Sequence, residues 1–234
     1  MRLLSNEELV TMSTYKHSAS KTTLECWLIK GPLSYVEPMF PSILSANTLT
    51  LMGQLPITLL LFYVFATEGM NITPDNLINP RLLIACGICV EWFSLVDIMD
   101  GMRARRLKVG SPLGRFVDEA GDTIVISNYC VLIAYLFCFD NIWLEFAIFF
   151  MNLTFFGEEI RFKITKSLVM LVGEISSVEI ELMLSSFFVI FGYYGNECLQ
   201  KSIGEQFGLE ADSNFALIAP YRLSYAIGMV FVAL

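Results

Sequence analysis

Charged side chains are scarce in this chain. Only 16% of its 234 residues are Asp, Glu, Lys or Arg, while 55% are hydrophobic, and the mean hydropathy is +0.61. This composition excludes an ordinary soluble domain and indicates a membrane protein. The formal net charge of −8 leaves no basic surface outside short loops, which argues against nucleic acid as a partner.

Histidine occurs once, at His17, in a polar N-terminal region where a surface position is expected. The six cysteines lie mostly inside apolar runs, and Cys86 and Cys89 have redox-motif spacing without the βαβ context that such a site needs. They are therefore expected to be small buried hydrophobes. No signal peptide or Arg-rich transit peptide is visible ahead of the first apolar run.

Six apolar runs predict six transmembrane helices, because each is about long enough, or nearly so, to cross a hydrocarbon core of roughly 30 Å. They cover residues 48–66, 82–99, 123–139, 142–156, 178–194 and 215–234, and residues 167–172 could lengthen the fifth. Before them, Leu24, Trp27, Leu28 and Ile29 predict a short amphipathic helix in the membrane interface, which Pro32 ends.

The predicted fold class is an all-α membrane protein with six transmembrane helices and an N-terminal interfacial amphipathic helix. No linker, repeat or low-complexity tract divides the chain, so residues 1–47 are expected to form a cytosolic or interfacial segment and residues 48–234 the core. With a cytosolic N-terminus, twelve of the fifteen Lys and Arg residues fall on the cytosolic side and two on the other. This distribution satisfies the positive-inside rule.

Eight positions follow a fixed spacing where the second apolar run meets a basic loop: Asp97-x2-Asp100-Gly101-x2-Ala104-Arg105-x8-Gly114-x3-Asp118-x3-Asp122. Asp97 and Asp100 are three residues apart and Asp118 and Asp122 four apart, so each pair would share one helix face. Four carboxylates gathered at a membrane end repel one another and lose hydration, which indicates hard cations as partners. Oxygen-only ligands favour Mg²⁺, Mn²⁺ or Ca²⁺ over zinc.

This spacing resembles the signature of the CDP-alcohol phosphotransferases at every fixed position. The stretch 100–106 and the following Ser111-Pro112-Leu113-Gly114 are more similar to the choline and ethanolamine phosphotransferase branch than to bacterial members. Residues 15–18, 40–53 and 173–179 resemble the same branch more weakly. The resemblance implies that Asp97, Asp100, Asp118 and Asp122 hold two Mg²⁺ or Mn²⁺ ions that bridge the diphosphate of a CDP-alcohol.

The same resemblance assigns Gly101, Ala104, Arg105 and Gly114 to substrate binding. Gly101 and Ala104 would let a nucleotide approach the helix backbone, and Arg105 would donate to a phosphate. Asn47 is either a polar contact for the cytidine or its phosphate, or the N-cap of the first membrane helix. The remaining cations of this region are expected at anionic lipid headgroups rather than at substrate; they are Arg103, Arg106, Lys108 and Arg115.

The sequence departs from the branch at Glu119, because a histidine usually follows the third aspartate there as a candidate base. Glu119 or Asp122 would have to serve as the catalytic base instead, which a carboxylate can do if desolvation raises its pKa. Members of the branch also normally continue through further membrane helices, whereas the printed sequence ends at Leu234.

Two functions remain open. In the first, the protein transfers phosphocholine or phosphoethanolamine from a CDP-alcohol to diacylglycerol and releases CMP; membrane phospholipids surround it and the enzyme would be alone or a homodimer. In the second, it is an inactive or weakly active homologue that serves as a lipid-binding structural subunit among other membrane proteins. The expected location is the endoplasmic reticulum membrane, with the mitochondrial inner membrane as the alternative.

Overall fold

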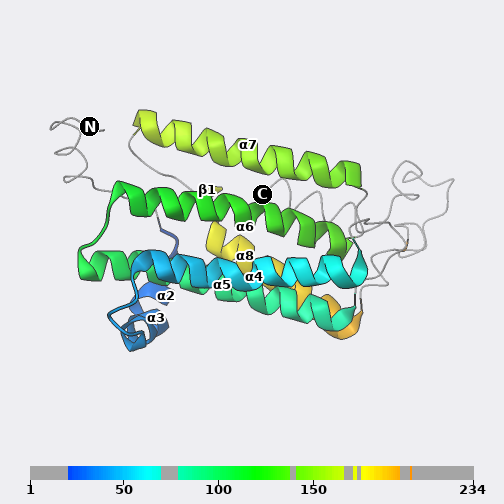
Figure 1. The fold of residues 1–234 in the computed structure, drawn as a ribbon, viewed down its shortest axis with the longest axis horizontal. Coiled ribbons are helices and arrows are strands. Elements are labelled where there is room, and N and C mark those ends of the chain that lie inside the picture. Colours follow the sequence, from blue (N-terminus) through cyan, green and yellow to red (C-terminus); the bar gives the residue numbers. More distant parts are fainter. Residues whose placement is uncertain are drawn as a thin grey trace.

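The computed structural model describes residues 21–69, 79–137, 141–165, 171–172, 175–195 and 201 of the chain. These ranges are helical apart from one short pair of strands (Figure 1). In chain order the elements are α2 (Thr23–Lys30), α3 (Pro32–Val36), the 3-10 helix η1 (Glu37–Met39), α4 (Ala46–Glu68), α5 (Pro80–Leu107), α6 (Pro112–Phe137), α7 (Asn141–Thr165), β1 (Leu171–Val172), β2 (Ile175–Ser176) and α8 (Ser177–Tyr194).

The helices α4, α5, α6 and α7 run alternately in opposite directions along the long axis of the molecule (Figure 1). The start of α4, the end of α5 and the start of α6 therefore lie together at one end, beside the short helices α2 and α3. We call this the motif end, because it carries the spaced aspartates of the sequence motif. All parts of the spaced motif thus lie on one pair of antiparallel helices and the turn between them.

Three described helices are long and apolar enough to cross a membrane: Ala46–Thr67, Pro80–Leu107 and Ser177–Tyr194. They contain most or all of the predicted spans 48–66, 82–99 and 178–194. The predicted spans 123–139 and 142–156 fall on α6 and α7, and α7 carries a shorter apolar segment, Leu144–Gly157. The predicted sixth span, 215–234, lies outside the described residues, as do His17 and the first twenty residues.

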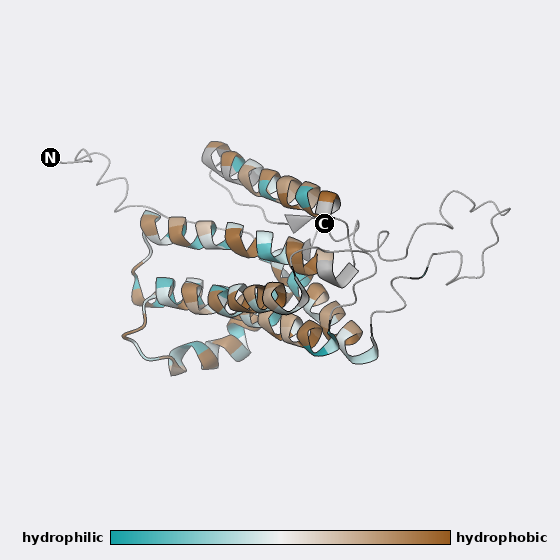
Figure 2. Ribbon diagram, turned by 45° about the vertical axis from the view of Figure 1, so that its right-hand side comes forward, coloured by the Kyte–Doolittle hydropathy of each residue, from teal (hydrophilic) through white to brown (hydrophobic). Residues whose placement is uncertain are grey.

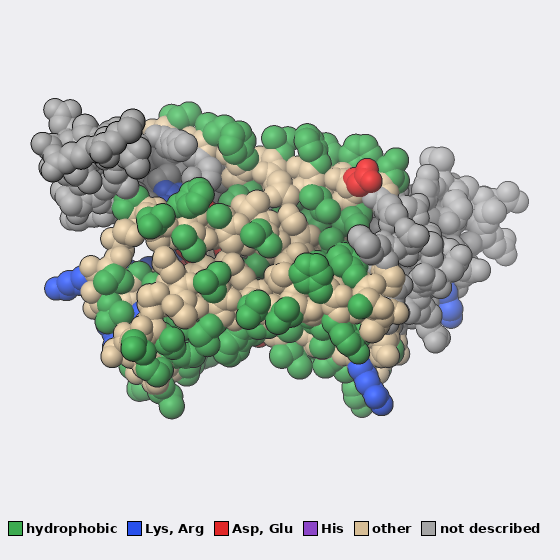
Figure 3. Space-filling model, viewed as in Figure 1, with side chains coloured by type: hydrophobic (Ala, Val, Ile, Leu, Met, Phe, Trp, Pro, Cys, Tyr) green, Lys and Arg blue, Asp and Glu red, His purple; other side chains and the backbone are tan. Residues whose placement is uncertain are grey.

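Hydrophobic residues predominate along the helices (Figure 2), and many hydrophobic side chains are exposed on the face drawn in Figure 3. On the face drawn in Figure 3, hydrophobic side chains occupy the middle, and Lys and Arg lie toward the ends of the molecule. Examples on α4 and α7 are Leu59, Phe62, Phe149 and Phe156, all more than half exposed. Such surfaces are costly in water and suit contact with lipid, in agreement with an integral membrane protein.

Small residues bring α5 and α8 together. A Cβ atom on Gly87 would lie 2.8 Å from the backbone oxygen of Ser185, and one on Gly192 would lie 2.8 Å from that of Pro80. The Ser185 hydroxyl also donates to the backbone oxygen of Gly87 over 2.9 Å. Close backbone approach through glycine and serine is the usual way in which membrane helices pack. Here it fixes the position of the helix that carries the motif.

Pro56 lies inside α4 and has no N–H to donate to the carbonyl of Met52. The indole Nε1 of Trp92, on α5, donates to that carbonyl oxygen over 3.0 Å. An unpaired carbonyl in hydrocarbon would cost several kcal/mol, so the contact both satisfies α4 and ties it to α5.

The predicted short helix before Pro32 is confirmed as α2. Its Leu24, Leu28 and Ile29 pack against an apolar cluster at the motif end, while Trp27 is exposed. Behind α2, a charged group that we call the Glu37 cluster (Glu37, Arg103 and Arg106) joins η1 to α5.

The expectation that Arg103 faces lipid headgroups is wrong. Its side chain is fully buried, and Nη2 donates to the backbone oxygens of Phe40 and Pro41 over 3.0 and 2.6 Å. Arg106 is also engaged, with Nε 2.8 Å from Oε2 of Glu37. The arginine spacing alone could not reveal this, because the partner residues precede Arg103 by 63 and 62 residues.

Two smaller expectations also have an outcome. Of the residues 167–172 that could lengthen the fifth span, 167–170 lie outside the described residues. Leu171–Val172 does not extend the helix but pairs with Ile175–Ser176 as antiparallel strands, and α8 starts at Ser177 with a capping box of Ser176 and Glu179. Because of this pair of short strands, the fold is not entirely helical as predicted. The expectation for cysteine is confirmed at Cys86 and Cys130, which are free and buried.

Candidate metal and substrate site

A tight turn between α5 and α6 places the two halves of the motif side by side. The helix α5 ends with Lys108 in the left-handed region at φ 55°, and Val109 N–H donates to the oxygen of Ala104 over 3.1 Å. Ser111 then caps α6, its hydroxyl accepting from Gly114 N–H over 3.0 Å, with Pro112 as the first helical residue. The chain thereby reverses within four residues, so the C-terminal half of α5 faces the N-terminal half of α6.

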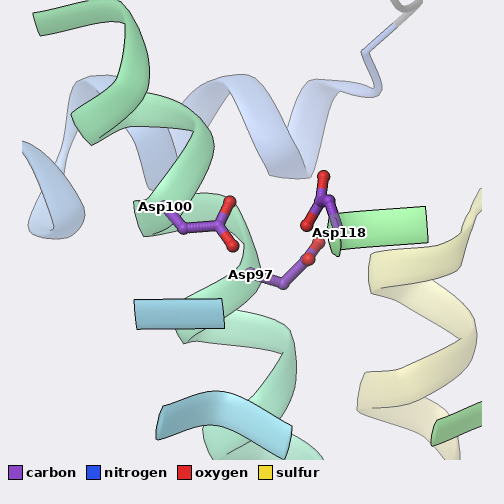
Figure 4. Close-up of side chains that lie close together, drawn as sticks. All are labelled: Asp97, Asp100 and Asp118. Carbon is purple, nitrogen blue, oxygen red and sulfur yellow. The ribbon is translucent and has the colours of Figure 1, made fainter. Parts of the chain in front are cut away.

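Three carboxylates meet across this helix pair. Asp97 and Asp100 project from α5 and Asp118 from α6, and their side chains point toward one another (Figure 4). One oxygen from each lies within 4.8 Å of the other two. We call these residues the aspartate cluster. Oxygens this close together can serve as ligands of one hard cation.

Asp122 lies beside the cluster without belonging to this closest group. It interacts electrostatically with Asp97 and with Asp118. The predicted pairs of motif aspartates, on α5 and on α6, are therefore brought to one place by the fold.

The cluster contains unsatisfied negative atoms. Oδ1 of Asp118 and Oδ1 of Asp122 are buried and have no hydrogen-bond partner among the described residues. For Asp118, which precedes the apolar part of α6, burial raises the pKa of the carboxyl, while a hydrogen bond with Asp100 and the charge of Arg115 act in the opposite direction. Buried carboxylate oxygens without partners are rare and costly, so these residues fit a bound hard cation.

Thr50 and Gln54, both on α4, were not singled out from the sequence. The Thr50 hydroxyl donates to Oδ2 of Asp100, and the Gln54 amide lies against Gly121 of α6. Residues 47, 50, 54 and 58 form a polar stripe at helical spacing within an otherwise apolar run. That periodicity was the signal that could have identified them.

Glu181 of α8 was also missed. Tyr129 OH donates to its Oε1 over 3.4 Å, Ser94 provides a further hydrogen bond, and the carboxylate interacts electrostatically with Asp97 and Asp122. An ionisable residue inside a predicted membrane span indicates function by default, and that signal was present in the sequence.

The predicted substrate residues lie beside the aspartate cluster, at the motif end. Asn47 is not the N-cap of α4, because Ser45 takes that place and its hydroxyl accepts from Thr48 N–H over 3.2 Å. Instead, Oδ1 of Asn47 faces Gly114 across the helix contact, 3.4 Å from where a Cβ atom on that glycine would stand. Asn47 and Gly114, 67 residues apart in sequence, are thus neighbours.

Arg105 folds back along α5 toward the aspartates. Its Nη1 lies 3.3 Å from where a Cβ atom on Gly101 would stand, and the side chain is exposed. Ala104 is half-buried. The space that Gly101 leaves is therefore bordered by a guanidinium group, which suits an approaching phosphate.

Glu119 points to a partner other than the cluster. Its Oε1 lies 3.1 Å from Nε of Arg115, one turn earlier on α6. The structure therefore places the two candidate bases differently, with Asp122 interacting with the aspartates and Glu119 in an ion pair.

Comparison with known proteins agrees with this geometry. The sequence profile of the CDP-alcohol phosphatidyltransferase family matches residues 43–196. The chain belongs to this family. The matched range runs from just before α4 to just after α8, so all the CDP-alcohol phosphatidyltransferase motif residues lie within it, while α2 and α3 precede it.

One curated member of the family can be compared directly. The chain is 30% identical over 132 residues to cholinephosphotransferase 1 of Xenopus laevis, a match that covers 53% of this chain and 30% of that protein. The chain thus matches less than a third of the length of this relative, and the similarity is distant.

Proposed function

We propose that this protein transfers phosphocholine or phosphoethanolamine from a CDP-alcohol to diacylglycerol and releases CMP. Membership of the CDP-alcohol phosphatidyltransferase family and the distant similarity to cholinephosphotransferase 1 support the reaction type. The observation that carries the proposal is the aspartate cluster, whose oxygens from two helices lie within 4.8 Å beside orphaned carboxylate oxygens. Without a bound cation this arrangement of buried carboxylates is unfavourable, so a purely structural role does not account for it.

Asp97, Asp100, Asp118 and Asp122 would hold two Mg²⁺ or Mn²⁺ ions. When bound, such ions neutralise the diphosphate and the phosphate that leaves with cytidine. Thr50 supports this arrangement from α4, because its hydrogen bond fixes the orientation of the Asp100 carboxylate.

The other motif residues would position the CDP-alcohol at the motif end. Arg105 is placed to donate to a phosphate oxygen, and Gly101 and Ala104 leave the backbone of α5 approachable. Asn47 of α4 and Gly114 of α6 lie next to each other at the same end, where they would contact the cytidine or its phosphate.

In the transfer, the acceptor hydroxyl oxygen forms a bond to the phosphorus that carries the alcohol. The bond between this phosphorus and the oxygen of CMP breaks, and CMP leaves with the electron pair. The hydroxyl proton passes to a carboxylate, for which Glu119 and Asp122 are the candidates within the motif. Asp122 is the preferred candidate, because it interacts electrostatically with Asp97 and Asp118, whereas Glu119 is held in an ion pair with Arg115.

We further propose six membrane spans. The motif end would lie on the cytosolic side of the endoplasmic reticulum membrane, where CDP-linked substrates would reach it. Three spans have the length and composition for this, and the charge distribution of the sequence supports the orientation.

The second function, a lipid-binding structural subunit, is favoured by one observation. Glu119 stands where a candidate base is expected, and its carboxylate is held in an ion pair with Arg115. Copurification from native membranes separates the two functions, because an enzyme would isolate alone or as a homodimer, and a subunit with a fixed set of membrane proteins.

The direct test is CMP release by the purified protein supplied with Mg²⁺, diacylglycerol and either CDP-choline or CDP-ethanolamine. We expect turnover with at least one donor, and a loss of at least about 100-fold in Asp100→Asn, since a metal ligand would be lost. Glu145→Gln, an exposed acid on α7, is the matched control and should keep the wild-type rate. Absence of turnover by the wild-type protein with both donors would overturn the proposal.

A further inference from the structure

Gln54 is a buried polar residue that the proposed chemistry does not use. Its side chain is 9% exposed, and Nε2 is buried without a hydrogen-bond partner among the described residues. In hydrocarbon, an amide N–H without a partner costs roughly 1–3 kcal/mol. An unsatisfied donor at this place therefore indicates a ligand that supplies an acceptor oxygen.

The amide is held at the contact between α4 and α6, directly beside the metal-binding helix face. A Cβ atom on Gly121 would stand 1.6 Å from Nε2 of Gln54, so only glycine at that position leaves room for the amide. Gly121 immediately precedes Asp122, and Thr50, one turn before Gln54 on α4, donates to Asp100. Gln54 thus lies beside Asp122, one turn further from the motif end than Thr50.

Its depth separates Gln54 from the residues proposed for the nucleotide. Gln54 is the ninth residue of α4, about 12 Å along the helix from Ala46, whereas Asn47 is in the first turn. A polar, charged donor enters from the motif end, where Arg105 and Gly114 lie. Gln54 lies level with Gly121 and Asp122, about one turn beyond Thr50, and is therefore better placed for the substrate that is dissolved in the membrane.

Exposed apolar side chains border the Gln54 position. Leu51 and Leu55 lie about 60° and 100° around α4 from Gln54, and they are 59% and 57% exposed. On α6, Ile124 lies one turn after Gly121 and is 55% exposed. The lipid-facing surface of both helices therefore begins immediately beside the amide, which leaves a lipid only a short lateral approach.

We propose that Gln54 binds the lipid acceptor, donating a hydrogen bond from its amide to an ester carbonyl oxygen of diacylglycerol. This inference rests on the proposed function for the identity of the lipid. The glycerol hydroxyl must reach the aspartates, and the ester groups are the acceptor oxygens nearest to that hydroxyl. A donor one helix turn deeper than Thr50 meets an ester oxygen while the hydroxyl faces the metal ligands. Gly121 keeps the amide in this position.

The test compares two lipids that differ only in the ester groups, diacylglycerol and dialkylglycerol, in nanodiscs of one composition. Gln54→Met keeps the length of the side chain and removes the donor. We expect it to raise KM for diacylglycerol about three- to tenfold, the effect of one neutral hydrogen bond. KM for CDP-choline should not change, and KM for dialkylglycerol should be the same in both proteins. Thr67→Val, whose hydroxyl bonds only within α4, is the matched control.

A second variant keeps the inference testable if Gln54→Met does not fold. Gly121→Ala would push the same amide away from α6, so it should raise KM for diacylglycerol. The double variant Gln54→Ala with Gly121→Ala should have the same KM for diacylglycerol as Gln54→Ala alone. Unchanged discrimination between the two lipids, or a rise in KM for CDP-choline instead, would overturn the inference.

Direct lipid binding separates this inference from the proposed function. Radiolabelled diacylglycerol and dialkylglycerol are bound to the purified protein without any CDP-alcohol. If the wild-type protein shows no turnover but prefers diacylglycerol through Gln54, the lipid site stands and the enzymatic proposal fails. If CMP is released but the Gln54 and Gly121 variants treat both lipids as the wild type does, the reaction stands and the lipid site fails.

Discussion

Two buried groups of charged residues lie at the motif end, and they differ in how their charge is compensated. In the Glu37 cluster, a 2% exposed carboxylate is bound by Arg106 and approached by Arg103, and Arg103 also donates to two backbone oxygens. In the aspartate cluster, three carboxylates face one another, and oxygens of Asp118 and Asp122 have no hydrogen-bond partner among the described residues. The first cluster holds charges of both signs, although Nε and Nη1 of its Arg103 are buried without a hydrogen-bond partner among the described residues. The second holds negative charge alone and needs a cation or a proton from outside.

The comparison teaches where function can be inferred from buried charge. Buried charges of opposite sign can join two segments, here η1 and α5, and their net charge calls for no ion from outside. A buried group of like charges is unfavourable by itself, so its presence indicates a bound cation or a shared proton. Both clusters contain residues from the same end of α5, so burial alone does not distinguish them.

The largest expected effect on stability comes from breaking the Glu37 cluster. Glu37→Gln should lower the free energy of unfolding by about 3–5 kcal/mol, because the fully buried Arg103 loses its nearest carboxylate. Thermal unfolding in detergent measures it, and Mg²⁺ should not restore the loss. A change below about 1 kcal/mol would show that the cluster is not a structural link.

An intermediate effect on stability should come from binding of a cation to the aspartate cluster. Mg²⁺ at about 100 times its dissociation constant should stabilise the wild-type protein by about 2.7 kcal/mol, and a chelator should reverse this. The midpoint of thermal unfolding with and without Mg²⁺ is the measurement.

Matched variants assign that stabilisation to the right cluster. Asp118→Asn should lose most of the response to Mg²⁺, whereas Arg106→Gln, from the Glu37 cluster, should keep it. An equal response in Asp118→Asn and the wild type would contradict a metal site at the aspartates.

The smallest expected effect is at Glu119. Its ion pair with Arg115 lies within one helix face, so Glu119→Gln should change stability by less than about 1 kcal/mol. CMP release should then change little in Glu119→Gln and be abolished in Asp122→Asn, if Asp122 or water takes the proton. A large loss in Glu119→Gln with normal stability would instead identify Glu119 as the base.

Restoring histidine sharpens this last test. Glu119→His should raise CMP release if the carboxylate is a poor substitute for the histidine of related enzymes. If the wild-type protein and Glu119→His both fail to turn over any CDP-alcohol, the aspartates are left as a scaffold and the structural-subunit hypothesis is preferred.

The sequence alone determined the membrane class, the position of most helices and the motif. These follow from local rules: apolar runs of sufficient length, and carboxylates three or four residues apart on one helix face. For the same reason, α2 could be predicted before Pro32. The cap of α4 did not follow, because Asn47 was the candidate and Ser45 takes that place.

Only the tertiary structure decided which residues meet across helices. Periodicity gives the face of one helix and not the partner of that face, so the sequence did not reveal that Thr50 contacts Asp100, that Gln54 fills the space at Gly121, or that Arg103 is buried against Phe40. These contacts depend on how closely the backbones approach, which the glycines and the turn at Lys108 fix. The motif supplied the ligands, and the packing of α4, α5, α6 and α8 decided what surrounds them.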